Sequence, residues 1–167
     1  ASILTRPTKT VEDIEETVTK IFNDIQKNKE HAVNKYTELF DGVKIKNSIV
    51  SEEEFKEASA LIPEKLRDAI QLAKRNIHKF HEAQKTSTVF VETTQGVSCW
   101  QEKRPIQKVG LYIPGGTAPL FSTVLMLAVP AQIAGCKEIV LCSPPDKEGK
   151  IHPAILYAAT LCGVTKI

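Results

Sequence analysis

The chain has 167 residues, of which 42% are hydrophobic and 25% are charged, and its formal net charge is +2. A chain of this length and composition can bury a substantial core, about 70% of the surface that its unfolded form exposes. The weak charge argues against a strongly basic nucleic-acid-binding protein. Proline and glycine interrupt the apolar runs before they reach the length of about 18 residues that a membrane-spanning helix needs. We therefore expect neither nucleic acid nor a membrane as a partner.

The first forty residues show helical patterns. Thr10 and Asp13 have the spacing of a helix N-terminal capping box, and apolar residues then recur at every third or fourth position. A second helix is predicted to end at Asp41-Gly42. After it, Ile45–Val50 is predicted to form a short strand.

The next sixty residues predict two further helices and then a hairpin. Ser51 and Glu54 repeat the capping spacing ahead of a further helix, and Ile62-Pro63 separates that helix from a longer one. Thr88–Thr94 and Val97–Trp100 then predict a hairpin with a glycine turn between its strands. Residues 1–104 are thus expected to be a mainly helical region with a small β-hairpin.

The pattern changes after Arg104-Pro105, where strands and helices begin to alternate. The predicted order is strand Val109–Ile113, helix Leu120–Ala134, strand Ile139–Ser143, helix Pro153–Cys162 and a strand beginning at Val164. This order predicts an α/β chain with a parallel sheet and right-handed crossovers. Residues 105–167 are expected to start a Rossmann-like nucleotide-binding domain. Its third strand has hardly begun at Ile167, which suggests a truncated β-α-β-α-β layer.

The stretch from Val109 to Cys136 carries no charged residue. Its helix has no polar face, so we expect neighbouring elements to cover it on every side. The loop at residues 114–119 leads into this helix, and the unpaired N–H groups and the dipole of a helix N-terminus favour a phosphate or carboxylate.

The same loop supplies the candidate cofactor-binding residues Tyr112, Pro114, Gly115 and Gly116. They follow a parallel strand at its carboxyl end, where ligands of α/β proteins usually bind. Glycines let a ligand approach the backbone, and a tyrosine ring can stack on an adenine or a ribose. The alternative is that Tyr112 packs in the core and the glycines only turn the chain.

The usual dinucleotide-binding signature is absent. No GxGxxG follows the first parallel strand, and Leu141-Cys142-Ser143-Pro144 ends the second one without an acidic residue for the ribose hydroxyls. If NAD binds, it must use a different set of contacts, and its pyrophosphate need not sit on the loop at residues 114–119.

The cysteines and histidines give no pattern of a metal or disulfide site. The four cysteines are far apart and form no CxxC pair: Cys99, Cys136, Cys142 and Cys162. Three of them lie in apolar runs, where cysteine packs as a small hydrophobic residue. With no secretion signal at the start of the chain, this predicts free thiols in a cytoplasmic protein. His78 and His81 share a helix face but lack further ligands nearby, so a solvated surface is expected there.

The amino-acid sequence of the α/β part closely resembles that of one protein family. Arg104-Pro105-Ile106, VGLYIPGGTAPL, STVLMLAVPA, IAGC, LCSPP and LYAATLCGV are similar to histidinol dehydrogenase, and YTELFDGV and TTQGVSCW extend the resemblance upstream. The resemblance implies the N-terminal part of a zinc- and NAD-dependent homodimeric enzyme of histidine biosynthesis, which oxidises L-histidinol to L-histidine through L-histidinal. It matches Tyr112 to a residue that contacts NAD and, less directly, brings Phe40 to the nucleotide site.

The resemblance also implies that the catalytic residues lie outside this chain. The family's zinc ligands (a Gln, an Asp and two His) and its Glu-His acid–base pair lie downstream of the matched region. No catalytic or metal-binding residue is therefore assigned here, and the chain alone is predicted to be inactive. Two alternatives remain: a non-catalytic binding or assembly module, and an aldehyde-dehydrogenase-like oxidoreductase. The second would need a catalytic cysteine, whereas Cys136 and Cys142 are expected to pack.

Overall fold

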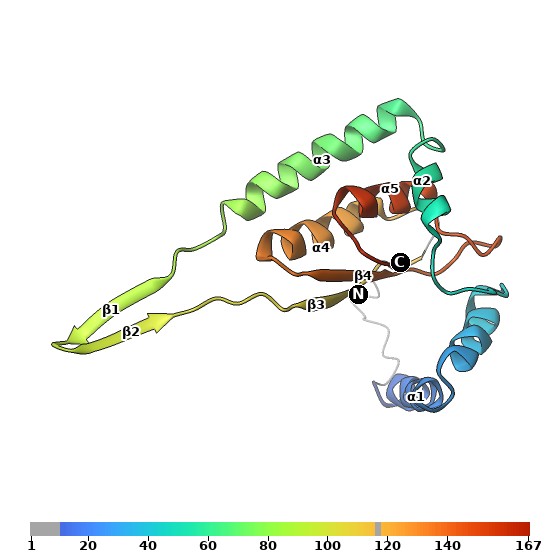
Figure 1. The fold of residues 1–167 in the computed structure, drawn as a ribbon. Coiled ribbons are helices and arrows are strands. Elements are labelled where there is room, and N and C mark those ends of the chain that lie inside the picture. Colours follow the sequence, from blue (N-terminus) through green and yellow to red (C-terminus); the bar gives the residue numbers. More distant parts are fainter. Residues whose placement is uncertain (1–10, 116–117) are drawn as a thin grey trace, which may run out of the picture. The chain divides into compact units, whose positions relative to one another are not determined.

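The computed structural model describes residues 11–115 and 118–167 (Figure 1). The chain divides into two compact units, Ala1–Ile45 and Lys46–Ile167. This division differs from the boundary predicted between residues 104 and 105. Helix α3 (Glu64–Glu82), which precedes that boundary, packs against helix α4 (Phe121–Ala134), which follows it.

The described part of the first unit consists mainly of helix α1 (Val11–Asp41). Lys29 interrupts α1 with a φ of 49° and a ψ of −127°, so two helical segments meet there, as the sequence predicts. The helix ends at Asp41, and Gly42 adopts a φ of 72°, the left-handed conformation that commonly follows a helix. The capping residue predicted at Thr10 lies outside the described residues.

The strand predicted at Ile45–Val50 is wrong, because this segment has no regular structure. The Asn47 side chain accepts a hydrogen bond of 3.0 Å from the N–H of Ile49. Such a local side-chain turn competes with strand pairing for the backbone. Val50 does donate to the carbonyl of Ile167 at 3.0 Å, which ties the end of this segment to the C-terminal residues.

Helix α2 (Glu52–Ala58) begins with the predicted capping box. The Glu54 N–H donates to the Ser51 Oγ at 3.2 Å, and the Ser51 N–H donates to the Glu54 carboxylate at 3.0 Å. Each side chain thus satisfies a backbone donor that the first helical turn leaves unpaired. This confirms the cap that the sequence predicts.

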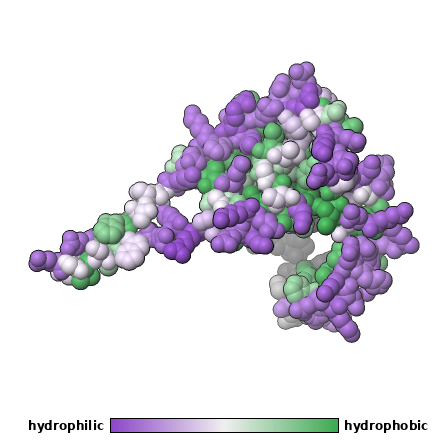
Figure 2. Space-filling model, in the orientation of Figure 1, coloured by the Kyte–Doolittle hydropathy of each residue, from purple (hydrophilic) through white to green (hydrophobic). Residues whose placement is uncertain are grey.

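The predicted hairpin is also confirmed. Strands β1 (Val89–Thr94) and β2 (Val97–Gln101) pair antiparallel around Gly96, whose φ is 82°. All their residues are exposed, including the opposed pair Phe90 and Trp100. Figure 2 accordingly shows hydrophobic residues, in green, on the surface of this hairpin.

Strands β3 (Lys108–Tyr112) and β4 (Glu138–Cys142) form the predicted parallel pair, in register from Lys108 opposite Glu138 to Tyr112 opposite Cys142. α4 connects them, and helix α5 (Pro153–Leu161) follows β4. The predicted third strand is limited to a parallel bridge between Lys166 and Val140. The chain here follows the order that the sequence predicts.

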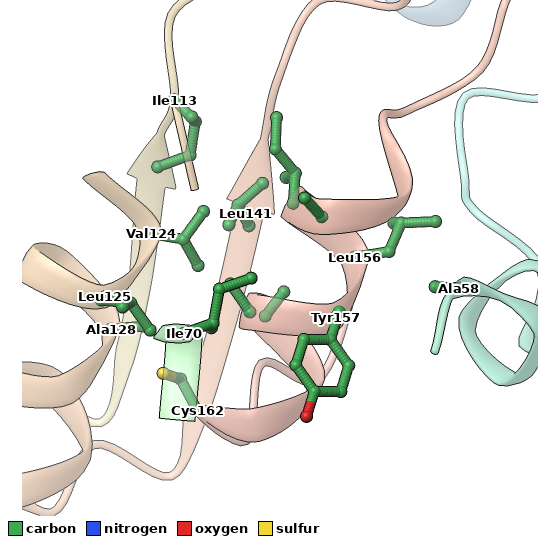
Figure 3. Packing of buried hydrophobic residues seen from close by; sticks show 14 of the residues in the cluster. Ala58, Ile70, Ile113, Val124, Leu125, Ala128, Leu141, Leu156, Tyr157 and Cys162 are labelled. Carbon is green, nitrogen blue, oxygen red and sulfur yellow. The ribbon is translucent and has the colours of Figure 1, made fainter. Parts of the chain in front are cut away.

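Apolar side chains from β3, β4, α4 and α5 meet in one core (Figure 3). Ile113 and Leu141 from the sheet side are completely buried, as are Val124 and Leu125 from α4. Ile70 joins α3 to this cluster. Burial of apolar surface of this kind is the main favourable contribution to folding.

Two features of α5 complete the core. Gln71 of α3 donates to the Tyr157 hydroxyl at 2.8 Å, so the polar tip of this largely buried ring has a partner. The Cys162 thiol after α5 is buried, and loss of solvation raises its pKa. A neutral, unreactive thiol results.

The expectation that α4 is covered on every side is wrong for the described residues. Met126 and Leu127 are exposed, because α3, α5 and the sheet leave one side of the helix open. Pro130 lies inside α4 without ending it. Within residues 11–115 and 118–167, no helix has the length and apolar content to cross a membrane.

Candidate functional site

A cavity of about 200 Å³ opens at the carboxyl ends of β3 and β4. It lies between the loop after β3 and the loop after β4. Its lining residues are Pro114, Gly115, Ala118, Pro119, Leu120, Ser143, Pro144, Pro145, Asp146, Lys150, His152 and Ile155. This is the edge of a parallel sheet at which α/β proteins usually bind ligands.

The loop after β3 reaches the cavity because the strand pairing continues one residue beyond β3. The Ile113 N–H donates to the Cys142 carbonyl at 2.8 Å, and the Ile113 side chain is buried. Pro114 and Gly115 then leave the sheet. A Cβ on Gly115 would lie 3.1 Å from the Pro144 ring, so the two loops approach each other closely at a position that favours glycine.

The loop after β4 is held by its own hydrogen bonds. One oxygen of Asp146 (Oδ1) accepts hydrogen bonds of 2.9 Å from the N–H groups of Glu148 and Lys150. The Asp146 N–H in turn donates to the Lys150 carbonyl at 2.8 Å. These bonds fix the carboxylate relative to the loop backbone.

His152 ends this loop as the N-cap of α5. Its Nδ1 accepts a hydrogen bond of 3.1 Å from the Ala154 N–H, which in the neutral ring assigns the proton to Nε2. Asp146, Lys150 and His152 thus bring an acceptor, a cation and a neutral donor to one cavity.

The structure brings together some of the predicted cofactor residues. Pro114 and Gly115 line the cavity, whereas Gly116 lies outside the described residues. Tyr112 does not line it, and its side chain is 63% exposed. The interpretation of Tyr112 as a core residue is therefore wrong, and its ring is open to a ligand.

Phe40 belongs to the first unit, where its ring stacks on Tyr36 with centroids 5.9 Å apart. Its side chain is exposed. Its assignment to a nucleotide site stays a prediction.

The cysteines differ in part from expectation. All four are free, but Cys142 is exposed instead of packed, because it lies on the side of β4 that the buried Ile139 and Leu141 do not face. Cys136 is half-buried and follows the end of α4. In the described part of the chain, no three His, Cys, Asp or Glu side chains group so that they could hold a metal ion.

Sequence reasoning missed the polar residues after β4. It sought an acidic residue directly at the end of the strand, but Asp146 follows the strand's last residue, Cys142, by four positions. The run Asp146-Lys147-Glu148-Gly149 is typical of a turn, with Gly149 at a φ of 79°. That signal could have located a polar loop beside the candidate cofactor residues.

Comparison with known proteins places the chain in a family. The family model for histidinol dehydrogenase matches residues 4–167. Histidinol dehydrogenase from Bacteroides thetaiotaomicron is 56% identical over 167 residues, which are 100% of this chain and 39% of the relative. The enzyme of that name from Pasteurella multocida is 52% identical over 165 residues, 98% of this chain and 38% of the relative.

A solved structure agrees with the sequence comparisons. The crystal structure of histidinol dehydrogenase from Elizabethkingia anophelis has a TM-score of 0.90 and 51% sequence identity, covering 96% of this chain and 37% of that chain. The match decides against the aldehyde-dehydrogenase alternative. The chain spans about two fifths of the length of these relatives, and it belongs to the histidinol dehydrogenase family.

Proposed function

We propose that this chain supplies part of the nucleotide-binding site of an NAD-dependent oxidoreductase that converts L-histidinol to L-histidine through L-histidinal. The observation that carries the proposal is the cavity between the two loops, in a chain of this family, lined by Pro114 and Gly115. Bound NAD would supply the hydride acceptor for each of the two oxidations. One L-histidine would then require two NAD and one water, which adds to the aldehyde before the second oxidation.

The described residues fit the nucleotide better than the metal. A carboxylate, a lysine ammonium and an exposed tyrosine ring at one sheet edge are groups that bind sugars, phosphates and aromatic bases. No group of side chains in residues 11–115 and 118–167 fits zinc, so the proposed enzyme would hold its zinc with residues outside this chain. We propose that the chain alone lacks activity, and that the complete enzyme is a cytoplasmic homodimer.

Titration of NAD into the chain, followed by calorimetry, tests the cofactor part. Tyr112→Ala should weaken NAD binding several-fold, because a stacking partner is lost. Tyr112→Phe keeps the ring and should lose less NAD affinity than Tyr112→Ala. The melting temperature should change little, since the side chain is 63% exposed. NAD affinity that is equal in all three proteins would remove Tyr112 from the site.

An activity assay tests the second part. The purified chain with NAD, L-histidinol and added Zn²⁺ should form no more NADH than a boiled control, because it offers no metal site and no positioned base. Turnover above that control would show that the chain carries catalytic residues that we have not assigned. A complete lack of NAD binding by the chain and by any longer protein that contains it would favour the alternative of a non-catalytic module.

A further inference from the structure

The cavity contains one acidic side chain, Asp146, beside the loop of Pro114 and Gly115. We infer that Asp146 accepts hydrogen bonds from the hydroxyls of the adenosine ribose and makes the site select NAD over NADP. The inference rests on the proposed function and names one specificity-determining residue in it.

The size of the cavity suits a sugar. Its volume of about 200 Å³ is below the range of about 300–1,000 Å³ that is typical of whole small-molecule sites. That space can hold one pentose but not a whole dinucleotide, so the rest of the ligand must extend outside it. The apolar rings of Pro114, Pro119 and Pro144 form other parts of the lining and can contact the non-polar face of the sugar.

The Asp146 carboxylate is oriented before any ligand arrives. Its Oδ1 is engaged by two backbone N–H groups, those of Glu148 and Lys150, both at 2.9 Å. In the described residues, its Oδ2 takes part in no hydrogen bond or ion pair. A fixed carboxylate with one free oxygen is suited to accept hydrogen bonds from neighbouring hydroxyls without losing loop or side-chain entropy on binding.

Asp146 offers the same chemistry as the acidic residue of ordinary dinucleotide-binding folds, although it lies at a different place in the sequence. There an acidic residue at the end of the second strand binds the ribose hydroxyls and disfavours a 2′-phosphate. Here β4 ends at Cys142 without such a residue, and the loop after it returns Asp146 to the same sheet edge. A 2′-phosphate would meet like charge, whereas a 2′-hydroxyl would donate to the carboxylate.

Two other polar side chains, Lys150 and His152, face the same cavity. Lys150 bears a positive charge and forms no ion pair with any described residue, so it favours phosphate groups of either dinucleotide. His152 uses Nδ1 within its own cap and has only a neutral N–H to offer. Lys150 should therefore affect total affinity, while the fixed carboxylate of Asp146 determines which ribose substituent is accepted.

The test compares variants of the intact chain by calorimetric titration with NAD and with NADP. Asp146→Asn keeps an Oδ1 for the two loop N–H groups but removes the charge. It should weaken NAD binding by about tenfold and remove most of the preference over NADP. Glu148→Gln removes a charge from the same loop without lining the cavity and should change neither affinity. Lys150→Met should weaken both ligands, and NADP at least as much as NAD, because NADP carries one more phosphate.

A second measurement assigns the effect to the sugar. AMP should bind the unchanged chain about tenfold more tightly than 2′-deoxy-AMP, and this difference should vanish in Asp146→Asn, because the two changes remove the same hydrogen bond. Amide hydrogen exchange at Glu148 and Lys150 that stays as slow in Asp146→Asn as in the unchanged chain would show that the loop is intact.

The outcomes separate the two proposals. If the unchanged chain binds NAD and Asp146→Asn binds it equally well, the role of Asp146 is overturned while the NAD site stands. If the unchanged chain binds neither NAD nor AMP, both are overturned for this chain. An equal loss in Asp146→Asn and Glu148→Gln would also overturn the inference, since a general disturbance of the loop would then explain the effect.

Discussion

The two units of this chain are stabilised in different ways. In the unit from Lys46 to Ile167, aliphatic side chains of the sheet and its helices are fully buried. In the described part of the first unit, Ala32 is the one buried hydrophobic residue, and Val18, Phe22 and Leu39 are exposed. The unit Lys46–Ile167 depends on apolar burial, whereas the described part of the unit Ala1–Ile45 has little of it.

In the described part of the first unit, polar contacts join the two helical segments at the kink of α1. The Asp24 carboxylate accepts hydrogen bonds from Asn28 at 2.6 Å, from Lys35 at 2.7 Å and from Tyr36 at 3.0 Å. Lys35 and Tyr36 lie beyond the kink at Lys29, so one carboxylate joins the two segments of α1. The comparison suggests that core changes affect global unfolding, while changes at Asp24 act locally.

The largest effect is expected for a core leucine. Leu141→Ala should lower the free energy of unfolding by about 2–5 kcal/mol, because it removes buried methyl groups and leaves a cavity. Urea unfolding followed by circular dichroism measures this. Leu39→Ala in α1 is the matched control, and its 65% exposed side chain should contribute less than about 1 kcal/mol. Equal losses in the two variants would contradict the comparison.

A smaller loss of stability is expected from removing the hydrogen bond between Gln71 and the Tyr157 hydroxyl at the edge of the core. Tyr157→Phe removes the acceptor of the Gln71 hydrogen bond and should lower the free energy of unfolding by about 1 kcal/mol. The same substitution in a Gln71→Ala background should have almost no effect. An undiminished loss there would show that the tyrosine hydroxyl contributes through some other contact.

The sequence predicts the order and type of elements best where local signals agree with packing. The capping box of Ser51 and Glu54 and the hairpin turn at Gly96 need only nearby residues, and both are present. The strand predicted at Ile45–Val50 is absent, because apolar periodicity does not reveal the Asn47 turn that occupies the backbone.

Exposure and the site depend on contacts that no short pattern contains. Because α4 carries no charge, we expected other elements to cover it on every side. Met126 is nevertheless 53% exposed, because burial depends on which elements pack against the helix. Pro114 and Gly115 were found from the sequence because they directly follow a strand. Asp146 was not, because its place in the cavity depends on how a separate loop turns back.

At the kink of α1, Asp24→Asn tests the polar half of the comparison. It weakens the bonds to Lys35 and Tyr36, so amide hydrogen exchange near residues 24–36 should become several-fold faster. The urea midpoint of the other unit should not move. Glu16→Gln is the control, since Glu16 forms an exposed ion pair with Lys20 within one helical segment. Faster exchange throughout Lys46–Ile167 would contradict a local role.

The smallest effect is the pH dependence of the same contact. The hydrogen bond from Lys35, with those from Asn28 and Tyr36, lowers the pKa of Asp24 from 3.8 to about 2. A lowered folded-state pKa means that the ionised carboxylate stabilises the fold fully above pH 3.8, and that this contribution is lost as the pH falls toward about 2. Lys35 behaves in the opposite sense: Asp24 raises its pKa, so its contribution is present below pH 10.5 and is lost as the pH rises through the raised value.

The difference in exchange rates between the unchanged chain and Asp24→Asn isolates this contribution from that of the other carboxylates. The difference should be constant from pH 5 to 8 and shrink between about pH 4 and pH 2, the interval set by the ordinary and the lowered pKa of Asp24. Salt should reduce it, because the Lys35 side chain is 56% exposed and its charge is screened. A difference that persists below pH 2, where the carboxyl is protonated in both states, would show that its charge does not hold the kink.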